Sequence, residues 1–535
     1  MLFLALSACH DVDDTSASAA FVGCDGDDAA AVDVIVAPYV QDVTTDDAWI
    51  LWETTSGDGS RVDFGADLAR GACGAVLPVF PDAALADDDT RVHEVHLTGL
   101  SPDTTYEYRV RTGSTVGETL HFHTPPDDPE ASVRFVAVSD TQHDLARTDS
   151  WREVAQDGIV AYLGATRGGD LAEAVDGLLV PGDLVDNGWS REQWPLEFFP
   201  PVAPLSAQIP MYPAIGNHDG NSPFYFRYFH LPENGDGEHT YWFDRSNVRV
   251  IGLDSNAPFA DATQLDWLDD ALDDACANDT IDFVLVQQHH PYLSELWPHG
   301  ESAWTAQLVD RIDTFATTCG KPTVDLYGHT HGYSRGASID AVDLWLNVAT
   351  GGGAIDRWGN QGQADYPEFA VSQDTWGFVV FEAEAGDAPT LRIERVSRGN
   401  ADAPANNVVT DVVTLRRYNT PPVTPSIIAG PTGCGPVLIS ASPYSDPDGH
   451  PHAATEWQAA PTCEGFGTPT IDQLRQRQNE WGGVDLQAAD DLTDESFTAL
   501  TPGSEPCWRV RYRDDGLVWS GWSTPVSGMV PACGR

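Results

Sequence analysis

The chain has 535 residues, of which 41% are hydrophobic and 10% are aromatic, so it can bury several cores and wholesale disorder is excluded. At about 100–200 residues per domain, this length predicts three or four domains. The 82 acidic and 28 basic side chains give a formal net charge of −54. Such a surface repels the phosphates of nucleic acids and of anionic lipids, so we expect no nucleic-acid partner. No apolar run is long enough to cross a bilayer as a helix.

Residues 1–31 have the character of a targeting segment and tether. An apolar stretch leads from Met1 into Leu6-Ser-Ala-Cys9, which resembles the cleavage box of bacterial lipoproteins, where the cysteine is acylated. No Lys or Arg precedes the box and the apolar run is short, so a chance apolar start is the alternative. We expect lipidation at Cys9, as the only attachment to a membrane. The protein would then be extracytoplasmic, either anchored to the bacterial cell envelope or secreted.

The remaining cysteines predict disulfide bonds. No CxxC spacing occurs, which disfavours zinc binding, and an even number of cysteines, eight, remains once Cys9 is set aside. Four disulfides in an oxidising compartment would account for them. The cysteines are Cys24, Cys73, Cys276, Cys319, Cys434, Cys463, Cys507 and Cys533.

The region 32–127 is predicted to be a β-sandwich. Short alternating strands at 34–36, 48–52, 92–97 and 106–110 are separated by turns rich in Gly, Pro, Asp and Ser. The segment from Leu100 to Arg111 resembles the end of a fibronectin type III-like module.

A second sandwich is predicted for 420–535. Leu500, Pro502 and the Arg-Val-Arg at 509–511 repeat the offsets of Leu100, Pro102 and 109–111. Arginines at 509, 511 and 513 alternate onto one strand face, and Trp519-Ser-Gly-Trp-Ser follows. This resembles the Trp-Ser-x-Trp-Ser ladder of fibronectin modules in cytokine receptors, where guanidinium groups stack on indoles. A contact with a cell surface or a polymer is one possible use of this domain.

The region 131–415 changes character, because apolar runs alternate with helical stretches. Strands are predicted at 133–138, 177–180, 209–215, 283–286 and 324–327, and a helix at 264–272. This alternation indicates an α/β domain with buried strands. Hairpin-like pairs near 241–255 and 337–348 indicate a sheet that is not purely parallel.

Each of these five strands ends in a polar cluster. The clusters lie at 139–143, 182–188, 216–219, 288–291 and 328–331. Side chains at the carboxyl ends of the strands face one crevice in an open α/β sheet. Two aspartates, an asparagine and at least three histidines are too many ligands for one four-coordinate ion. They suit two first-row metal ions that share a carboxylate, an arrangement used to hydrolyse phosphoesters.

The ordered set of motifs resembles the calcineurin-like metallophosphoesterases, in the branch of purple acid phosphatases with an amino-terminal fibronectin-like domain. The resemblance covers about residues 32–400 and implies a four-layer αββα sandwich between the two β-sandwiches. It also implies the site. Asp140, Gln142 and His331 would bind one metal, Asn217, His289 and His329 the other, and Asp183 would bridge them. His218 would contact the phosphoryl oxygens and protonate the leaving group, and Asp219 would orient His218.

Two positions depart from the family pattern. Gln142 stands where many relatives have a ligand histidine, and we expect it to bind as a weaker oxygen ligand, with the next residue, His143, as the alternative. Asp186 stands where purple acid phosphatases place the tyrosine that binds ferric iron. The resemblance therefore implies two metal ions chosen from Fe, Zn and Mn, without a ferric-tyrosinate site. His290 is expected to be a neighbour of the metals and not a ligand.

Weaker signals leave alternatives open. Tyr225, in the aromatic run 224–229, could wall a substrate pocket or pack in the core. Arg335 could contact a phosphate oxygen or form an ion pair. The segment Asp446-Pro-Asp-Gly449 could bind calcium or form a plain turn.

The expected function is hydrolysis of a phosphorylated small molecule. A phosphomonoester is favoured because of the fibronectin-like leading domain, and a phosphodiester is the alternative on the same scaffold. A hypothesis from another class is a cell-surface binding protein whose phosphoesterase domain is catalytically silent. That hypothesis predicts damage to the ligand set, which is intact apart from Gln142.

Overall fold

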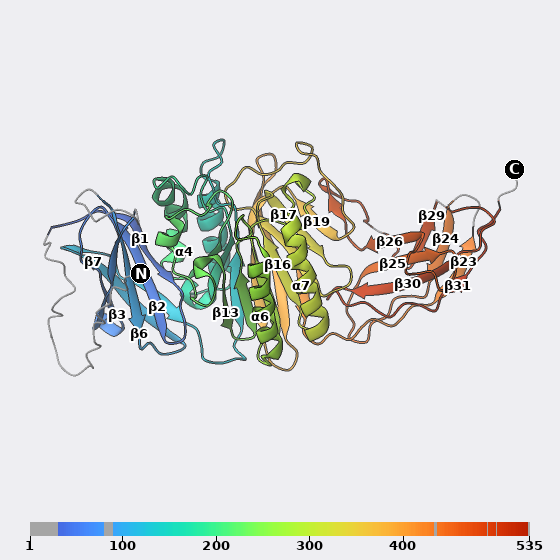
Figure 1. Ribbon diagram of the computed structural model, residues 1–535, viewed down its shortest axis with the longest axis horizontal. Coiled ribbons are helices and arrows are strands. Elements are labelled where there is room, and N and C mark those ends of the chain that lie inside the picture. Colours follow the sequence, from blue (N-terminus) through green and yellow to red (C-terminus); the bar gives the residue numbers. More distant parts are fainter. Residues whose placement is uncertain (1–29, 80–88, 433–435, 489, 499, 533–535) are drawn as a thin grey trace.

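The computed structural model describes residues 30–79, 89–432, 436–488, 490–498 and 500–532. Three regions follow one another along the longest axis, and a central α/β region is flanked by two β-rich regions (Figure 1). The predicted fold class is confirmed. The expected lipidation site Cys9 lies outside the described residues, as do Cys24, Cys434 and Cys533. The described residues include no helix long and apolar enough to span a membrane.

Two antiparallel sheets form the first β-rich region, in the strand orders β1-β2-β6-β5 and β4-β3-β7-β8, with β9 beside β7. The strands are β1 Val34–Gln41, β2 Asp47–Thr54, β3 Arg61–Phe64, β4 Arg70–Cys73, β5 Ala75–Pro78, β6 Arg91–Thr98, β7 Thr104–Thr112, β8 Thr115–Val116 and β9 Leu120–Thr124, with a short helix η1 at Ala66–Leu68. Alternate side chains of these strands meet in one core that includes Trp52 and Tyr108.

Two mixed sheets form the central region. The first has the order β12-β11-β10-β20-β21-β22, with strands β10 Val133–Ala137, β11 Gly177–Pro181, β12 Met211–Ala214, β20 Trp376–Glu384, β21 Thr390–Gly399 and β22 Pro404–Arg416. The second begins β13-β14-β15-β16-β18-β17-β19, with strands β13 Tyr241–Arg245, β14 Val248–Gly252, β15 Phe283–Gln287, β16 Thr323–Tyr327, β17 Gly332–Ala337, β18 Asp343–Ala349 and β19 Phe369–Gln373. The pairs β13–β14 and β17–β18 are antiparallel, which confirms the predicted hairpins.

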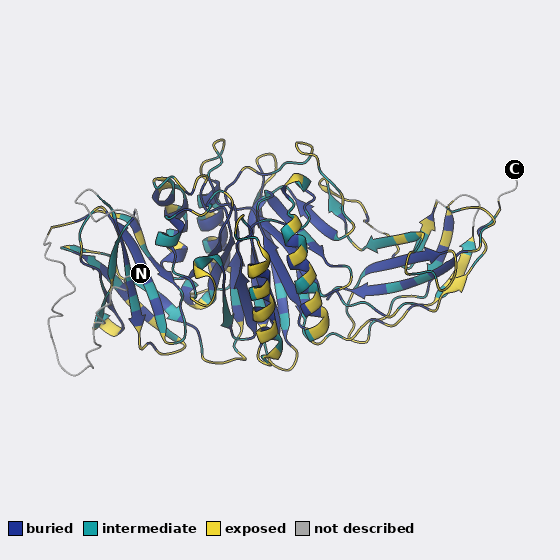
Figure 2. Cartoon of the chain, viewed as in Figure 1, coloured by how far each residue is buried: buried dark blue, intermediate teal, exposed yellow. Residues whose placement is uncertain are grey.

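Helices connect many of these strands. They are α1 Ser150–Arg152, η2 Glu153–Val160, α2 Ala161–Thr166, α3 Leu171–Ala174, η3 Trp194–Phe198, α4 Phe199–Ser206, α5 Tyr225–Tyr228, η4 Gly237–His239, α6 Ala262–Ala277, η5 Pro298–Gly300 and α7 Ala303–Cys319. The predicted helix 264–272 lies within α6, whose first turn is capped by the Asp261 carboxylate. Figure 2 shows exposed residues along the outer faces of α6 and α7 and buried residues in the sheet beneath them.

Two disulfides tie together distant segments. Cys276 at the end of α6 is bonded to Cys319 at the end of α7, and Cys463 is bonded to Cys507. Cys73 is also disulfide-bonded. The prediction of disulfides within the candidate domains is supported, and these bonds are typical of proteins that fold in an oxidising compartment.

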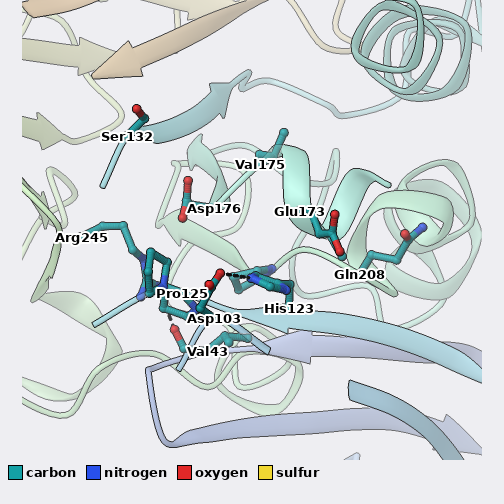
Figure 3. A pocket seen from close by; sticks show the side chains of 13 residues that line it. Val43, Asp103, His123, Pro125, Ser132, Glu173, Val175, Asp176, Gln208 and Arg245 are labelled. Atoms are coloured by element: carbon teal, nitrogen blue, oxygen red, sulfur yellow. Dashed lines mark hydrogen bonds and ion pairs between the residues drawn. The ribbon is translucent and has the colours of Figure 1, made fainter. Parts of the chain in front are cut away.

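The first β-rich region packs on the central region through buried polar contacts. The Tyr39 hydroxyl donates to the Tyr228 carbonyl at 2.7 Å, and the Tyr108 hydroxyl donates to the Ala207 carbonyl at 2.8 Å. A cavity of about 190 Å³ lies at this junction, where His123 faces Asp103 at 3.2 Å (Figure 3). None of the predicted site residues lines it.

The last β-rich region also consists of two sheets. Their orders are β23-β24-β29 and β26-β25-β30-β31, with strands β23 Ile427–Thr432, β24 Val437–Ala441, β25 His452–Ala460, β26 Ile471–Gln476, β29 Asp494–Phe497, β30 Cys507–Asp514 and β31 Val526–Ser527. The predicted arginine–tryptophan ladder is present, with the Arg509 guanidinium 4.0 Å from the Trp522 ring centroid and the Arg511 guanidinium 4.4 Å from that of Trp519. The ladder end contacts the β17–β18 turn, because the Trp519 indole donates to the Ile339 carbonyl at 2.6 Å.

One hairpin of the last region joins the central sheet instead of its own sandwich. Strands β27 (Glu480–Trp481) and β28 (Val484–Asp485) follow β19 as the eighth and ninth strands of the second central sheet. Val371 of β19 pairs in parallel with Glu480 of β27. The sequence pattern predicts a separate sandwich for 420–535 and gives no indication that one of its hairpins joins the central sheet.

Candidate metal centre

The five polar clusters follow strands that are parallel within each sheet. Strands β10, β11 and β12 are parallel neighbours in the first sheet, and β15 and β16 are parallel neighbours in the second. Their carboxyl ends therefore bring the clusters to one edge of the two-sheet sandwich. The backbone turns abruptly there, because Asp140, Asp183 and His329 have φ values of 56°, 54° and 70°. Non-glycine residues in this left-handed region are uncommon and concentrate at functional sites.

One group of side chains gathers around the second, third and fourth motifs. Asp183 Oδ2 lies 3.1 Å from His289 Nε2, which lies 3.1 Å from Asn217 Oδ1. Ligand atoms of Asp183, His289 and His329 all lie within 4.8 Å of one another, close enough to hold one cation.

A second group adjoins the first through Asp183. His331 Nε2 lies 3.2 Å from Asp140 Oδ1 and 3.2 Å from the Gln142 side-chain nitrogen, which is 3.5 Å from Asp183 Oδ2. By contrast, the neighbouring His143 bonds the Thr148 carbonyl at 2.8 Å and is directed away. The structure thus brings Gln142, and not His143, into the cluster.

Two glycines leave room for the carboxylates. A Cβ on Gly216 would lie 2.1 Å from Asp183 Oδ1, and a Cβ on Gly328 would lie 2.3 Å from Asp140 Oδ2. Any larger residue at either position would push an aspartate out of the cluster.

The electrostatics of the cluster favour a bound cation. Burial would raise the pKa of Asp183, but the adjacent His289 outweighs it and holds that pKa below its usual range. Burial lowers the pKa of His289, but Asp183 raises it to about 10 overall. Burial also lowers the pKa of His331, but the Asp140 carboxylate raises it to about 9 overall. The two imidazoles therefore hold protons that a metal ion would replace, since a ligand histidine must be neutral.

His218 lies at the edge of the cluster, with 38% of its side chain exposed and Nε2 4.0 Å from Asp183 Oδ2. Its Nδ1 lies 2.6 Å from the Asp186 carbonyl oxygen. A carbonyl only accepts hydrogen bonds, so Nδ1 carries the hydrogen and Nε2 is directed to the cluster.

The expectation that Asp219 orients His218 is wrong. Asp219 is fully buried, and its carboxylate accepts three backbone N–H bonds, from Asp183 at 2.8 Å, Leu184 at 2.9 Å and Gly216 at 2.9 Å. Asp219 therefore fixes the backbone that carries the bridging aspartate, and the Asp186 carbonyl orients the imidazole of His218.

Two expected substrate contacts are also corrected. Tyr225 is fully buried, and its hydroxyl donates to the Pro213 carbonyl at 3.0 Å, so it belongs to the core. Arg335 forms a two-pronged ion pair with Asp411, at 2.6 and 3.1 Å, which occupies its guanidinium. In both cases the alternative, core packing or an ion pair, accounts for the residue.

His290 is a neighbour of the cluster, as expected. Its Nδ1 lies 2.8 Å from the Ser255 hydroxyl, and burial lowers its pKa to about 3. In the last region, Asp446 Oδ1 accepts the N–H groups of Asp448 and His450 at 2.8 and 3.0 Å, as in a turn, and ligand atoms of these three residues all lie within 4.8 Å of one another, so both alternatives for this segment stay predictions.

Three residues that contact His329 or His331 were not predicted from the sequence motifs. The Asp356 carboxylate accepts the His331 N–H at 2.9 Å, and the Ala354 carbonyl lies 2.7 Å from His331 Nδ1. The Trp297 ring centroid lies 5.3 Å from that of His329. A possible signal was the Gly-Gly-Gly run at 351–353, since successive glycines after a buried strand permit close approach to another chain segment.

The donors in the cluster fit two metal ions. Carboxylate, amide and imidazole groups suit first-row divalent ions, and Asp183 lies between the two groups. The Gln142 side-chain oxygen is buried without a hydrogen-bond partner among the described residues, and a cation would satisfy it once the amide is turned.

Comparison with known proteins agrees with this geometry. Residues 133–333 match the model of the calcineurin-like phosphoesterase family, and residues 34–124 match that of the purple acid phosphatase N-terminal domain. Two uncharacterized proteins of Mycobacterium tuberculosis, from strains CDC 1551 and H37Rv, are each 26% identical over 344 residues, which cover 57% of this chain and 60% of theirs. The chain thus spans 60% of the length of these curated relatives.

Two solved structures resemble the fold. The purple acid phosphatase PPD1 from yellow lupin (Lupinus luteus) seeds has a TM-score of 0.53 and 16% identity, over 70% of this chain and 73% of that protein. PhoD has a TM-score of 0.51 and 12% identity, over 72% and 90%. At these identities the likeness concerns the fold alone. The chain therefore contains a calcineurin-like phosphoesterase domain that follows an N-terminal domain of the purple acid phosphatase type.

Proposed function

We propose that this protein is a metal-dependent hydrolase of phosphate esters, and of phosphomonoesters in particular. The observation that carries the proposal is the convergence of five strand ends, from two sheets, on Asp183 and its neighbours. The matched N-terminal domain supports the preference for monoesters, since it is named for the purple acid phosphatases. The substrate is a phosphorylated small molecule.

The proposed ligands divide into two sets around a shared aspartate. Asp140, Gln142 and His331 would hold one ion, Asn217, His289 and His329 would hold the other, and Asp183 would serve both. When bound, the ions supply Lewis-acid activation of the ester and of the attacking water. Because Asp186 occupies the position of the iron-binding tyrosine, we infer a pair chosen from zinc, manganese and ferrous iron.

His218 is the residue proposed to act on the substrate directly. With Nδ1–H bonded to the Asp186 carbonyl, a protonated Nε2 can donate to a phosphoryl oxygen and then to the departing alkoxide. The backbone N–H of His218 donates to Asp183 Oδ1 at 2.8 Å, which keeps the imidazole at a fixed distance from the shared aspartate. Partial exposure of the imidazole leaves it open to an incoming ester.

The net charge of the chain explains the need for cations at this site. A chain with a net charge of −54 repels an anionic ester, and Arg335 is already paired with Asp411. Bound metal ions would be the main local positive charge that attracts the phosphoryl group.

We further propose an extracytoplasmic location with a lipid anchor at Cys9. The disulfides Cys276–Cys319 and Cys463–Cys507 support an oxidising compartment. We keep the domain limits 32–127, 131–415 and 420–535 as part of the proposal, with a possible surface or polymer contact through the last region.

Asn217→Ala tests the function. We expect about a 100-fold loss of aryl phosphate hydrolysis with an unchanged fold, because one oxygen ligand is removed. Asn221→Ala, at an exposed asparagine four residues further along, is the matched control and should keep full activity. Retained activity in Asn217→Ala, or activity that survives a strong chelator, would refute the assignment.

A second assay separates the two ester classes. The same protein is given an aryl phosphate and the corresponding bis-aryl diester, and we expect the higher kcat/KM for the monoester. A large preference for the diester would replace the monoesterase proposal with the diesterase alternative. Turnover of neither ester with Zn²⁺, Mn²⁺ or Fe²⁺ would favour the silent-domain hypothesis.

A further inference from the structure

The hairpin at residues 477–487 belongs in sequence to the last region but lies against the central domain. Its strand β27 extends the second central sheet beside β19, and its strand β28 is the outermost strand of that sheet. We define this segment as hairpin 477–487.

Hairpin 477–487 is hydrogen-bonded to the loop that joins β18 to β19. The Trp481 indole donates to the Ala364 carbonyl at 3.1 Å, and the Asn479 amide donates to Asp365 Oδ1 at 3.1 Å. The Trp481 ring also packs against Trp358, with centroids 5.5 Å apart. The hairpin therefore holds both halves of this loop, which we call loop 353–368.

Loop 353–368 contacts His331 directly. Its first residues supply the Ala354 carbonyl at Nδ1 and the Asp356 carboxylate at the backbone N–H of His331. A Cβ on Gly353 would lie 2.6 Å from the His331 ring, which shows how closely the backbone follows the imidazole. The position of this loop thus fixes the ring orientation and the nitrogen that faces Asp140.

The same loop is also bonded to the segment beside His329. The Tyr366 hydroxyl donates to Glu301 at 2.9 Å, and its backbone N–H donates to Glu295 at 2.8 Å. These two glutamates flank Trp297, whose ring lies 5.3 Å from His329. Contacts, joined by short stretches of chain, therefore lead from the hairpin to both histidines of the fifth motif.

We propose that hairpin 477–487 is a positioning element for the metal centre, which holds loop 353–368 so that His329 and His331 keep their ligand geometry. This inference rests on the proposed function, which makes the cluster a metal centre, but its test measures the order of loop 353–368 and the affinity for metal. The last region would then help to position the metal ligands, in addition to any external contact that it makes. Partners of ligand histidines commonly change metal affinity by about 10- to 100-fold when they are removed.

The test uses the full-length protein with three substitutions. Trp481→Ala removes the indole bond to Ala364 and the contact with Trp358, whereas Trp481→Phe removes the bond and keeps a ring. Val484→Ala is the matched control, because Val484 is on the same hairpin and is 59% exposed. Hydrogen exchange of loop 353–368 is measured in chelator-treated protein, and Zn²⁺ affinity is measured by competition with a chelating dye.

In Trp481→Ala, we expect the amides of loop 353–368 to exchange about ten times faster than in the wild type. We expect this variant to bind Zn²⁺ about ten times more weakly. Trp481→Phe should lie between this variant and the wild type, and Val484→Ala should match the wild type. Unchanged loop exchange and unchanged Zn²⁺ affinity in Trp481→Ala would overturn the proposal. So would faster exchange confined to the last region, since the hairpin would then stabilise only its own domain.

Hydrolysis of an aryl phosphate is assayed separately, so that the two proposals can fail independently. If the wild type binds Zn²⁺ but hydrolyses nothing, the proposed function fails while loop exchange and affinity still decide the role of the hairpin. If the wild type is active and Trp481→Ala behaves like the wild type in exchange and affinity, the hairpin proposal fails alone.

Discussion

Asp219→Ala separates a structural role from a catalytic one. The carboxylate of Asp219 is fully buried and accepts the backbone N–H groups of Asp183, Leu184 and Gly216. Alanine leaves these three donors without an acceptor and without access to water. We therefore expect this substitution to destabilise the ends of β11 and β12 as well as to abolish activity.

The magnitude follows from the number of donors. A buried donor left unsatisfied costs about 1–3 kcal/mol, so three of them cost about 3–6 kcal/mol if the backbone relaxes partly. Asp183 lies within this turn, so the same relaxation would move the shared carboxylate and stop turnover. His218→Ala, by contrast, removes a side chain that is 38% exposed and should change stability by less than about 1 kcal/mol.

Native-state hydrogen exchange of the β11 and β12 amides measures the free energy of local opening in each variant. We expect a drop of about 3–6 kcal/mol in Asp219→Ala and almost none in His218→Ala, with both inactive. If Asp219→Ala kept the opening free energy of the wild type and lost only kcat, the structural role would be refuted. Orientation of His218 by Asp219 would then be the better explanation.

Three further predictions concern other parts of the chain. Gln142→His should bind Zn²⁺ more tightly than the wild type in a chelator competition, because imidazole is a stronger ligand than an amide oxygen; equal or weaker binding would contradict the position given to Gln142. Burial raises the pKa of Glu295 from 4.5 to about 8, so between these pH values the folded state binds a proton that the unfolded state does not. The free energy of unfolding therefore falls as the pH rises from about 4.5 towards 8. Glu295→Gln, which keeps an acceptor for the Tyr366 N–H, should therefore raise the Tm at pH 9 and not at pH 5; the same shift at both pH values would exclude titration as the cause. Replacing both Cys276 and Cys319 by Ser should lower stability by about 3 kcal/mol, and reductant should lower the denaturation midpoint of the wild type by more than that of the double variant, which keeps the Cys463–Cys507 bond; an equal decrease in both would contradict the role of Cys276–Cys319.

Much of the fold and of the metal cluster could be predicted from local sequence. Buried strands such as Phe283–Gln287 are apolar runs that end in a polar motif, so strand, strand end and ligand are encoded within about ten residues. Parallel pairing of such strands then brings the motifs together without further information. The gathering of Asp140, Asp183 and His289 is a consequence of this arrangement.

What could not be predicted depends on contacts between distant segments. Arg335 and Asp411 are 76 residues apart, and only the fold reveals that they meet. Asp219 follows His218 directly, but the turn directs the two side chains in different directions, so adjacency in sequence was misleading. The pairing of Glu480 with Val371 could not be predicted, because a strand of two residues is too short to show an alternation of apolar and polar side chains.

The shared sheet has a consequence for biosynthesis. Strands β27 and β28 lie at 480–485, so the ribosome must synthesise more than a hundred further residues after β19 before the second central sheet has all its strands. Nascent chains otherwise tend to fold domain by domain from the amino end. Completion of this sheet is thereby delayed until residue 485 has been synthesised, and a product truncated before residue 480 would have β19 as an uncovered edge open to aggregation.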